Sequence, residues 1–384
     1  MLRAETFHPS DLPPGLVEAW REMCEQHPDF RNPLLGPDFA QAVGKVRGDA
    51  RVTVWYWSTL NGGSRPAGFL AYHRRTGGVA RPIGAPLSDY TALVSSDVLD
   101  IDEALTVAGL PAYRFNGLVD PYGSFRTVQT LEQESYLIGL DGSADDYLEA
   151  LRVNSPKRFK NYRRLDHKLD REVGALRIVA HDADPAVLTQ LLDWKRDQLA
   201  RTGGQDFLRP DWIRQLLAGL HQQTEGPMQG LLISLYAGSD LVAGHFGIRS
   251  GAAYHPWIAA TDPRFAAWSP GQIFLLRAIA AMPELGLATY DIGPGHDHYK
   301  RPYARSTRLI RSGAATATTA LGRAAQVTEQ AWALAGARGD GAVGRLRRRL
   351  DAITAVEPSF GGRAVSLVAT LASRARRTSS EPAG

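Results

Sequence analysis

The 384-residue sequence contains a single cysteine, Cys24, and therefore cannot form a disulfide within the chain. A lone cysteine is typical of a reducing compartment. The first fifteen residues, MLRAETFHPSDLPPG, lack the apolar core of a signal peptide, and no run of about eighteen apolar residues occurs anywhere. We therefore expect a cytoplasmic protein without a membrane-spanning helix. His245 and His255 do not have the spacing of a metal site, and Cys24 is too distant from them in sequence to contribute, so we expect no metal cofactor.

Lysine is absent from residue 301 onward, where 14 arginines face 5 acidic residues. The whole chain has 44 basic and 40 acidic residues, which leaves 30 basic and 35 acidic residues in residues 1–300. The main body is thus mildly acidic and the tail is strongly basic, so the whole-chain net charge of +4 describes neither part.

The order of predicted elements repeats along the chain. In the first half, β-rich runs at residues 52–59, 66–73 and 79–83 precede a helix at 97–108 and a strand at 113–119. In the second half, a strand at 175–180 and helices at 185–200 and 212–220 precede strands at 230–236, 241–249 and 252–260. A helix after Ser269-Pro270-Gly271 and a strand at 288–292 follow. We interpret this order as two copies of one α/β unit.

Three stretches resemble the tandem acyltransferase fold of the Gcn5-related (GNAT) superfamily. They are residues 269–304 with SPGQIFLLRAI and GLATYDIGPGHDHYKRPYA, residues 154–169 with NSPKRFKNYRRLDHKL, and residues 81–93 with RPIGAPLSDYTAL. Within that superfamily the sequence looks most like the CelD/BcsL-type group (BioF2-like acetyltransferase domain), which is related to the FemAB-like aminoacyl transferases. The resemblance implies two tandem GNAT-like units at 1–140 and 141–315, each a mixed, mainly antiparallel sheet flanked by helices. A basic helical tail at 316–384, disordered at its end (378–384), would follow.

The resemblance implies acyl transfer from acyl-CoA, with acetyl as the expected group, to an amine or hydroxyl of an envelope or polysaccharide precursor. An alkyl amine with a pKa near 10.4 is almost wholly protonated at pH 7, so a base is required. Asp291 ends a strand beside the helix that would carry the cofactor, and His255 lies on the preceding strand. Tyr299 is a candidate to protonate the leaving thiolate. The alternatives are ordinary structural roles: a turn cap for Asp291, a core histidine for His255 and a half-buried aromatic for Tyr299.

A helix N-terminus attracts phosphate, because its first N–H groups lack partners and carry partial positive charge. The cofactor-binding candidates are therefore at the helix start or in the segment RFAAWSPG that precedes it: Arg264, Ser269, Gly271 and Gln272. The substrate-binding candidates are polar residues expected near the cleft: Asp89, Tyr90, Lys157, Arg158, His245 and Lys300. For Lys157 and Arg158 on the basic helix, a solvated outer face is an equal alternative to a polyanion site.

The tail carries apolar stripes beside arginines, for example Leu346 and Leu350 beside Arg345 and Arg349. This pattern in residues 340–377 suits an anionic membrane surface or a partner groove, so the protein is expected to be cytoplasmic or peripheral at the inner membrane face. Docking of the tail onto the main body is equally compatible with it. Two rival functions stay open: an aminoacyl-tRNA-dependent FemAB-like transferase, and a non-catalytic scaffold for polysaccharide synthesis. Apart from tRNA in the first rival, the acidic body argues against nucleic acid as a partner.

Overall fold

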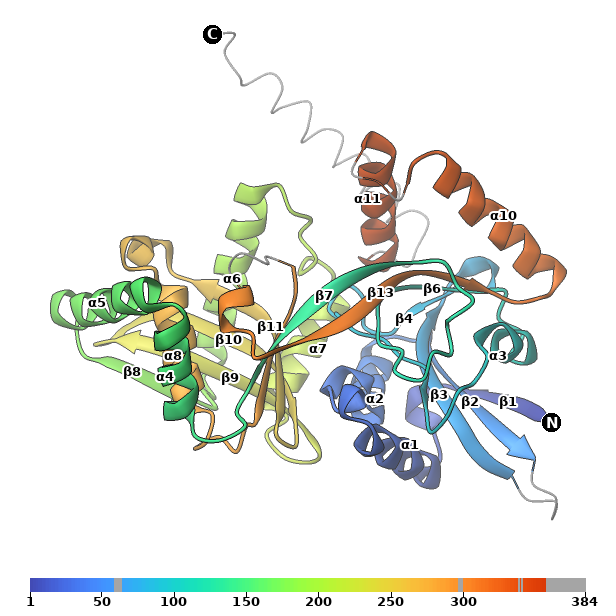
Figure 1. The fold of residues 1–384 in the computed structure, drawn as a ribbon, viewed down its shortest axis with the longest axis horizontal. Coiled ribbons are helices and arrows are strands. Elements are labelled where there is room, and N and C mark those ends of the chain that lie inside the picture. The colour runs from blue at the N-terminus through green and yellow to red at the C-terminus, as the bar shows by residue number, and fades with distance from the viewer. Residues whose placement is uncertain (59–63, 296–299, 338, 340, 357–384) are drawn as a thin grey trace, which may run out of the picture.

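The computed structural model describes residues 1–58, 64–295, 300–337, 339 and 341–356. Within these residues, thirteen strands form one mixed sheet that runs the length of the molecule (Figure 1). The strand order is β1-β2-β3-β4-β6-β13-β7-β12-β11-β10-β9-β8, with β5 paired to β3. The predicted turn at 61–63 and the predicted disordered end lie outside the described residues.

The N-terminal half is built from six strands and three helices. Burial is nearly continuous along the middle of β2 and β3, so both faces of this part of the sheet are covered. The elements are β1 (Leu2–Phe7), α1 (Pro14–Gln26), α2 (Pro37–Val46), β2 (Ala50–Ser58), β3 (Ser64–Arg74), β4 (Ala80–Pro82), β5 (Val94–Ser95), α3 (Ile101–Val107) and β6 (Ala112–Leu118). Helix α3 begins later than predicted because the Asp100 side chain caps it, accepting from the backbone N–H groups of Asp102 and Glu103.

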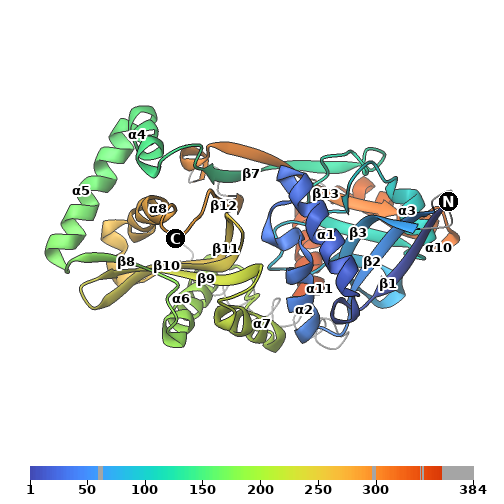
Figure 2. The same ribbon diagram turned by 90° about the horizontal axis from the view of Figure 1, so that it is seen from below.

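The C-terminal half follows the predicted order of elements. They are β7 (Thr130–Gly139), α4 (Ala144–Asn154), α5 (Pro156–Glu172), β8 (Leu176–Ala180), α6 (Pro185–Thr202), α7 (Asp211–Gln222), β9 (Met228–Ala237), β10 (Asp240–Ser250), β11 (Ala253–Thr261), α8 (Pro270–Ala281), β12 (Thr289–Pro294) and β13 (Ser306–Thr316). Figure 2 shows α4, α5 and α8 on one face of this half of the sheet and α6 and α7 on the other.

Strands β7 and β13 join the two halves. β13 pairs antiparallel with β6 of the N-terminal half and, on its other side, with β7, which in turn pairs with β12. β7 falls inside the predicted first unit (1–140) and β13 lies almost wholly inside the second (141–315), yet both strands stand at the centre of the common sheet. The two halves therefore share backbone hydrogen bonds rather than only side-chain contacts.

Apolar packing reinforces this connection. One cluster of buried side chains includes Phe39 and Val43 of α2 together with Ile213 and Leu217 of α7, from opposite halves. A second cluster lies between α8 and the strands of the C-terminal half, and a third lies under α3. Because the first cluster is continuous across the junction, the site between the halves is held in a fixed geometry.

The tail continues from β13 as two helices, α10 (Ala320–Leu334) and α11 (Ala342–Val356). Both lie beside the β4, β6 and β13 side of the N-terminal half (Figure 1). Within the described residues, no helix is both long and apolar enough to cross a membrane.

Candidate functional site

The site lies where β11 and β12 separate. These two parallel strands pair only at Ala253 with Thr289 and at Tyr254 with Tyr290. The next residue on each strand is His255 and Asp291, respectively. Side chains alternate between the two faces of a strand, and Tyr254 and Tyr290 pack toward the α8 face, their rings 4.9 Å apart. His255 and Asp291 consequently share the opposite face, toward the N-terminal half.

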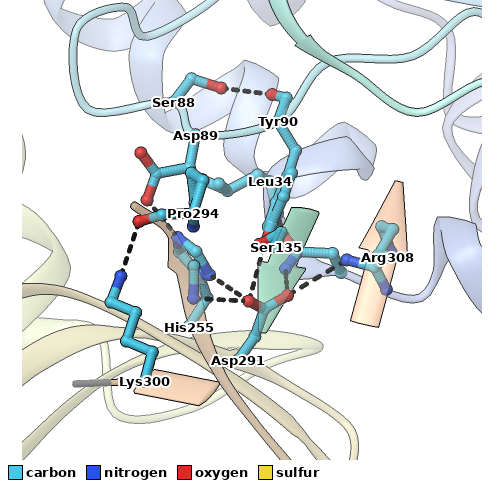
Figure 3. Close-up of polar contacts among 12 residues, drawn as sticks. Leu34, Ser88, Asp89, Tyr90, Ser135, His255, Asp291, Pro294, Lys300 and Arg308 are labelled. Atoms are coloured by element: carbon cyan, nitrogen blue, oxygen red, sulfur yellow. Dashed lines mark hydrogen bonds and ion pairs between the residues drawn. The ribbon is translucent and has the colours of Figure 1, made fainter. Parts of the chain in front are cut away.

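Asp291 is buried and accepts hydrogen bonds on both carboxylate oxygens (Figure 3). Its Oδ1 accepts from the Tyr90 hydroxyl at 2.6 Å and from the backbone N–H of Gly293 at 3.0 Å. Its Oδ2 accepts from Asn32 Nδ2 at 3.0 Å and from Arg308 Nη1 at 3.1 Å. The donors come from the N-terminal half, from β12 itself and from β13, so Asp291 links the strands and loops that meet here.

His255 lies between two carboxylates (Figure 3). Its Nε2 is 3.1 Å from Asp89 Oδ2, and its Nδ1 is 3.6 Å from Asp291 Oδ1, an ion-pair distance beyond hydrogen-bond range. The ring packs edge-on against Tyr90, with centroids 5.2 Å apart. The His255 side chain is fully buried, whereas 39% of the Asp89 side chain is exposed. Asp89 is thus the member of this group that reaches solvent.

The electrostatics follow from these contacts. Burial on its own lowers the pKa of His255, but the carboxylates of Asp291 and Asp89 outweigh it and raise the pKa to about 9. Burial raises the pKa of Asp291, yet His255, Arg308 and Tyr90 together lower it to about 2. Burial, followed by the negative charge of Asp291, raises the pKa of Tyr90 well above its usual value. At neutral pH the centre holds an imidazolium, a carboxylate and a neutral tyrosine.

A cavity of about 750 Å³ adjoins this cluster. Asp291 and Arg308 line it from the sheet, and Asn32 and the turn at Pro28–Phe30 line it from the N-terminal half. The β-turn residues Gly251 and Ala252 and the exposed Ala288 form the far wall. The residues at the start of α8 are not part of its lining.

Residues 156–301 match the family model described as "Acetyltransferase (GNAT) domain". This part of the chain is therefore similar to a GNAT acetyltransferase domain. The match contains α5, the β8–β11 strands, α8 and both His255 and Asp291, and the predicted fold class of two tandem GNAT-like units is confirmed. We accordingly describe the protein as an N-acyltransferase.

The chain is also similar to several solved structures, of which FemX supports the same architecture. FemX superposes with a TM-score of 0.51 at 12% identity, covering 81% of this chain and 96% of FemX. A tandem GNAT protein from the clavulanic acid biosynthesis pathway gives a TM-score of 0.47 at 9% identity, covering 83% of this chain and all of the other. The C-terminal domain (DUF2156) of a putative lysylphosphatidylglycerol synthetase from Agrobacterium fabrum gives 0.45 at 13% identity, over 82% and 95%. At such identities the likeness concerns the fold alone. No curated protein matches the chain.

The structure brings four predicted site residues together: Asp89, Tyr90, His255 and Asp291. Lys300 lies at the nearby loop, where its Nζ donates to the Pro294 carbonyl at 2.7 Å. The contributions of Asn32, Ser135 and Arg308 were missed by sequence reasoning. The only sequence signal at Asn32 is the Asn-Pro pair, which indicates a turn. Arg308 lies on a strand whose sequence shows no alternation of apolar and polar residues.

The GNAT domain's other predicted residues lie apart from this cluster. His245 faces α8, 4.3 Å from the Phe274 ring, and its Nδ1 is hydrogen-bonded to the Tyr290 hydroxyl at 2.7 Å. Burial and then the charges of Lys195 and Lys300 lower the pKa of His245 to about 3, so it is neutral at pH 7. The two histidines therefore occupy opposite faces of the sheet and form no common site.

The predicted cofactor residues gather around the start of α8. Ser269 precedes the helix in a left-handed conformation, and its side chain makes no capping hydrogen bond. The Gln272 side chain accepts a hydrogen bond from the Tyr303 hydroxyl. Arg264 is exposed and already paired with Asp262 at 2.7 Å and Asp240 at 3.3 Å. Their role in cofactor binding, like that of Gly271, stays a prediction.

Two further predictions concern exposed or undescribed residues. Lys157 and Arg158 are exposed in the first turn of α5, remote in sequence from the Asp291 cluster. Tyr299 lies outside the described residues. Tyr254, which neighbours His255, donates its hydroxyl proton to the backbone carbonyls of Leu231 and His245 and is therefore already engaged.

Proposed function

We propose that the protein transfers an acyl group, with acetyl as the expected one, from acyl-CoA to an amine or hydroxyl of an acceptor. The observation that carries the proposal is the buried His255, held between Asp89 and Asp291 at the point where β11 and β12 diverge. Beyond Tyr254, the edge of β11 that faces β12 has no ladder partner in the described chain. N–H groups on this edge would donate hydrogen bonds to the developing oxyanion of the thioester.

In this proposal His255 acts as the acid. The acceptor nitrogen attacks the thioester carbonyl, the C–S bond breaks, and the departing thiolate takes a proton. A thiol has a pKa near 8.5 and His255 one of about 9, so proton transfer from the imidazolium to the thiolate is nearly balanced. Asp89, the exposed carboxylate, would receive the proton that the acceptor loses.

For Asp291 we propose a positioning role in place of the base predicted from sequence. A carboxylate with a pKa of about 2 is a weak base at neutral pH, and both its oxygens accept hydrogen bonds. It holds His255 charged and fixes Tyr90 and Arg308 around it. We therefore propose Asp89 as the base in place of Asp291, because the Asp89 side chain is partly exposed to solvent and can contact an acceptor.

The cavity of about 750 Å³ is the proposed entrance for the acceptor, because both halves of the protein line it and Asp291 forms part of its wall. His255 and Asp89 are not among its lining residues, so the reacting group would have to pass Asp291 to reach them. Its volume suits an acceptor of sugar or nucleotide size. An envelope or polysaccharide precursor is the class that the CelD/BcsL-type resemblance implies. Coenzyme A would bind at the start of α8, where Ser269, Gly271 and Gln272 lie.

The donor is tested by thermal shift with acetyl-CoA and by release of free coenzyme A thiol in the presence of an amine panel. We expect a rise in melting temperature and acceptor-dependent thiol release. No shift at millimolar acetyl-CoA, together with no thiol release, would reject acyl-CoA as the donor.

The acceptor site is tested by Ala288→Trp, which fills the cavity from an exposed position. We expect the KM for the acceptor to rise roughly tenfold or more while the KM for acetyl-CoA stays unchanged. A matched control is Ala218→Trp, an exposed alanine on α7 that does not line the cavity. Equal effects of the two substitutions on both KM values would place the acceptor elsewhere.

One observation favours an aminoacyl-tRNA donor as the second candidate. Lys157, Arg158, Lys160 and Arg163 are exposed on α5, and none forms an ion pair with a carboxylate of the described chain. Such a stripe would bind tRNA with a strong salt dependence. Loss of tRNA binding in Lys157→Glu/Arg158→Glu, with no acetyl-CoA binding by the parent protein, would favour this donor.

A further inference from the structure

The tail helices are fixed to the body by a network of ion pairs. Asp351 of α11 accepts from Arg81 at 3.1 Å and from Arg114 at 2.6 Å, two arginines of the N-terminal half. Glu329 of α10 pairs with Arg347 of α11 at 2.7 Å and with Arg114 at 3.5 Å. These carboxylates are two-thirds or more buried, so the network fixes which faces of α10 and α11 turn inward.

The outer face of α10 is apolar. Leu321, Val327 and Leu334 are 68%, 64% and 90% exposed, among the most exposed large apolar side chains of the molecule. With the exposed alanines 324 and 331 they recur at spacings of three and four residues, so they form one stripe along the helix. The half-buried Trp332 faces the other way, toward Arg347, whose guanidinium lies 4.6 Å above its ring.

The tail helices also carry exposed cations. Arg323 of α10 and Arg345 and Arg349 of α11 are exposed, and Leu346 of α11 is 49% exposed. In the described part of the tail helices, the acidic residues are Glu329 and Asp351, and both are bound to arginines beneath the helices. The outward surface of this part of the tail therefore presents apolar and cationic groups without a carboxylate.

We propose that this outer surface of α10 and α11 binds an anionic lipid bilayer. Apolar side chains would enter the region between headgroups and acyl chains while the arginines meet lipid phosphates. A nucleic acid would match the arginines but not the three exposed apolar side chains. A second copy of the chain, docked face to face, would place the arginines of the two copies near one another, where they would repel. The sequence beyond residue 356 repeats the pattern, with Leu367 and Leu371 ahead of three arginines at 374, 376 and 377.

The test uses the full chain and vesicle flotation with phosphatidylcholine alone and with added phosphatidylglycerol. We expect binding to the anionic vesicles that weakens as salt rises from about 0.1 to about 0.5 M. Val327→Glu/Leu334→Glu should reduce partition roughly tenfold or more. Arg345→Gln/Arg349→Gln should reduce it roughly 20- to 30-fold on anionic vesicles, because each arginine near such a surface contributes about fivefold.

The control is Val153→Glu on α4, a 65% exposed apolar residue far from the tail, which should leave partition unchanged. Val153, Val327 and Leu334 are exposed, so the glutamate variants at these positions should have the circular dichroism spectrum and melting temperature of the parent protein. The proposal is overturned if the parent protein does not float with anionic vesicles, or if only Leu367→Glu removes binding. It is likewise overturned if light scattering shows a dimer that Val327→Glu dissociates while vesicle binding persists.

Discussion

His255 and Asp291 occupy equivalent positions on two parallel strands, each directly after the last pair that joins β11 to β12. On its other edge β12 stays paired with β7 as far as Pro294, across a bulge between Asp291 and Gly293. A longer β11–β12 ladder would leave no opening beside His255. The bulge therefore lies at the point where β11 and β12 separate, next to Asp291.

Replacing His255 by glutamine should lower kcat by about a hundredfold or more, the usual contribution of a positioned acid. An imidazolium with a pKa of about 9 is present throughout the neutral range, so parent kcat should fall as pH rises through about 9. His255→Gln should lack that alkaline limb. The measurement is kcat against pH, with His167→Gln, an exposed histidine on α5, as control. An unchanged alkaline limb in His255→Gln would remove His255 from the proposed mechanism.

The same histidine should make stability depend on pH. Its folded pKa of about 9 exceeds the unfolded value near 6.5, so its stabilising contribution is complete below about pH 6.5 and is lost as pH rises through about 9. The shift corresponds to at most about 3 kcal/mol. Urea unfolding at pH 6 and pH 9.5 should show a larger loss for the parent than for His255→Gln. Equal losses would mean that the carboxylates do not hold the imidazolium in the folded state.

Arg308→Met should be strongly destabilising, because it removes the guanidinium that donates to the buried Asp291 carboxylate and leaves His255 as its remaining cation. Breaking one side of such a pair costs about 3–5 kcal/mol. Asp291→Asn in the same chain should recover part of that loss, a coupling that a double-mutant cycle of unfolding free energies measures. Arg311→Met on the same strand is the matched control: Arg311 is 28% exposed and pairs with Asp120 and Glu132, so its loss should cost far less. Additive effects of the Arg308 and Asp291 substitutions would contradict the coupling.

The sequence predicted the second half of the fold more fully than the first. The strands and helices from residue 175 onward carry clear apolar periodicity, and α8 begins where the Ser-Pro-Gly signal places it. Strands β1, β7 and β13 were missed because their apolar residues do not alternate cleanly. In β7 the run from Leu131 to Glu134 is exposed, and β13 consists largely of small or charged residues. Their strand conformation comes from pairing with each other and with both halves, which local sequence does not encode.

At the site, the sequence predicted several of the functional residues but not the side chains that pair with them. Asp89, Tyr90, His255 and Asp291 carry visible chemistry near turns and strand ends. Arg308 and Asn32 enter only through contacts that span 17 and 259 residues of sequence, respectively. Those partners decide that Asp291 is a buried, hydrogen-bonded carboxylate with a low pKa, so its chemistry depends on tertiary contacts that no short motif displays.

The docking of the tail rests on Asp351, and its removal should release α11 without unfolding the body. Asp351→Asn cancels the charge that Arg81 and Arg114 both contact, at 3.1 and 2.6 Å. Because this network is partly exposed, we expect the unfolding free energy of the body to change by only about 1 kcal/mol or less. Hydrogen exchange of α11, by contrast, should accelerate by several fold, since Ile353 is its one buried large apolar side chain in the described part of the helix. Asp102 lines a second cavity, which lies between the tail helices and strands β6 and β13, but it is outside these ion pairs, so Asp102→Asn should leave exchange in α11 unchanged. If α11 exchanges at the parent rate in Asp351→Asn, apolar packing rather than the arginine pairs holds the tail in place.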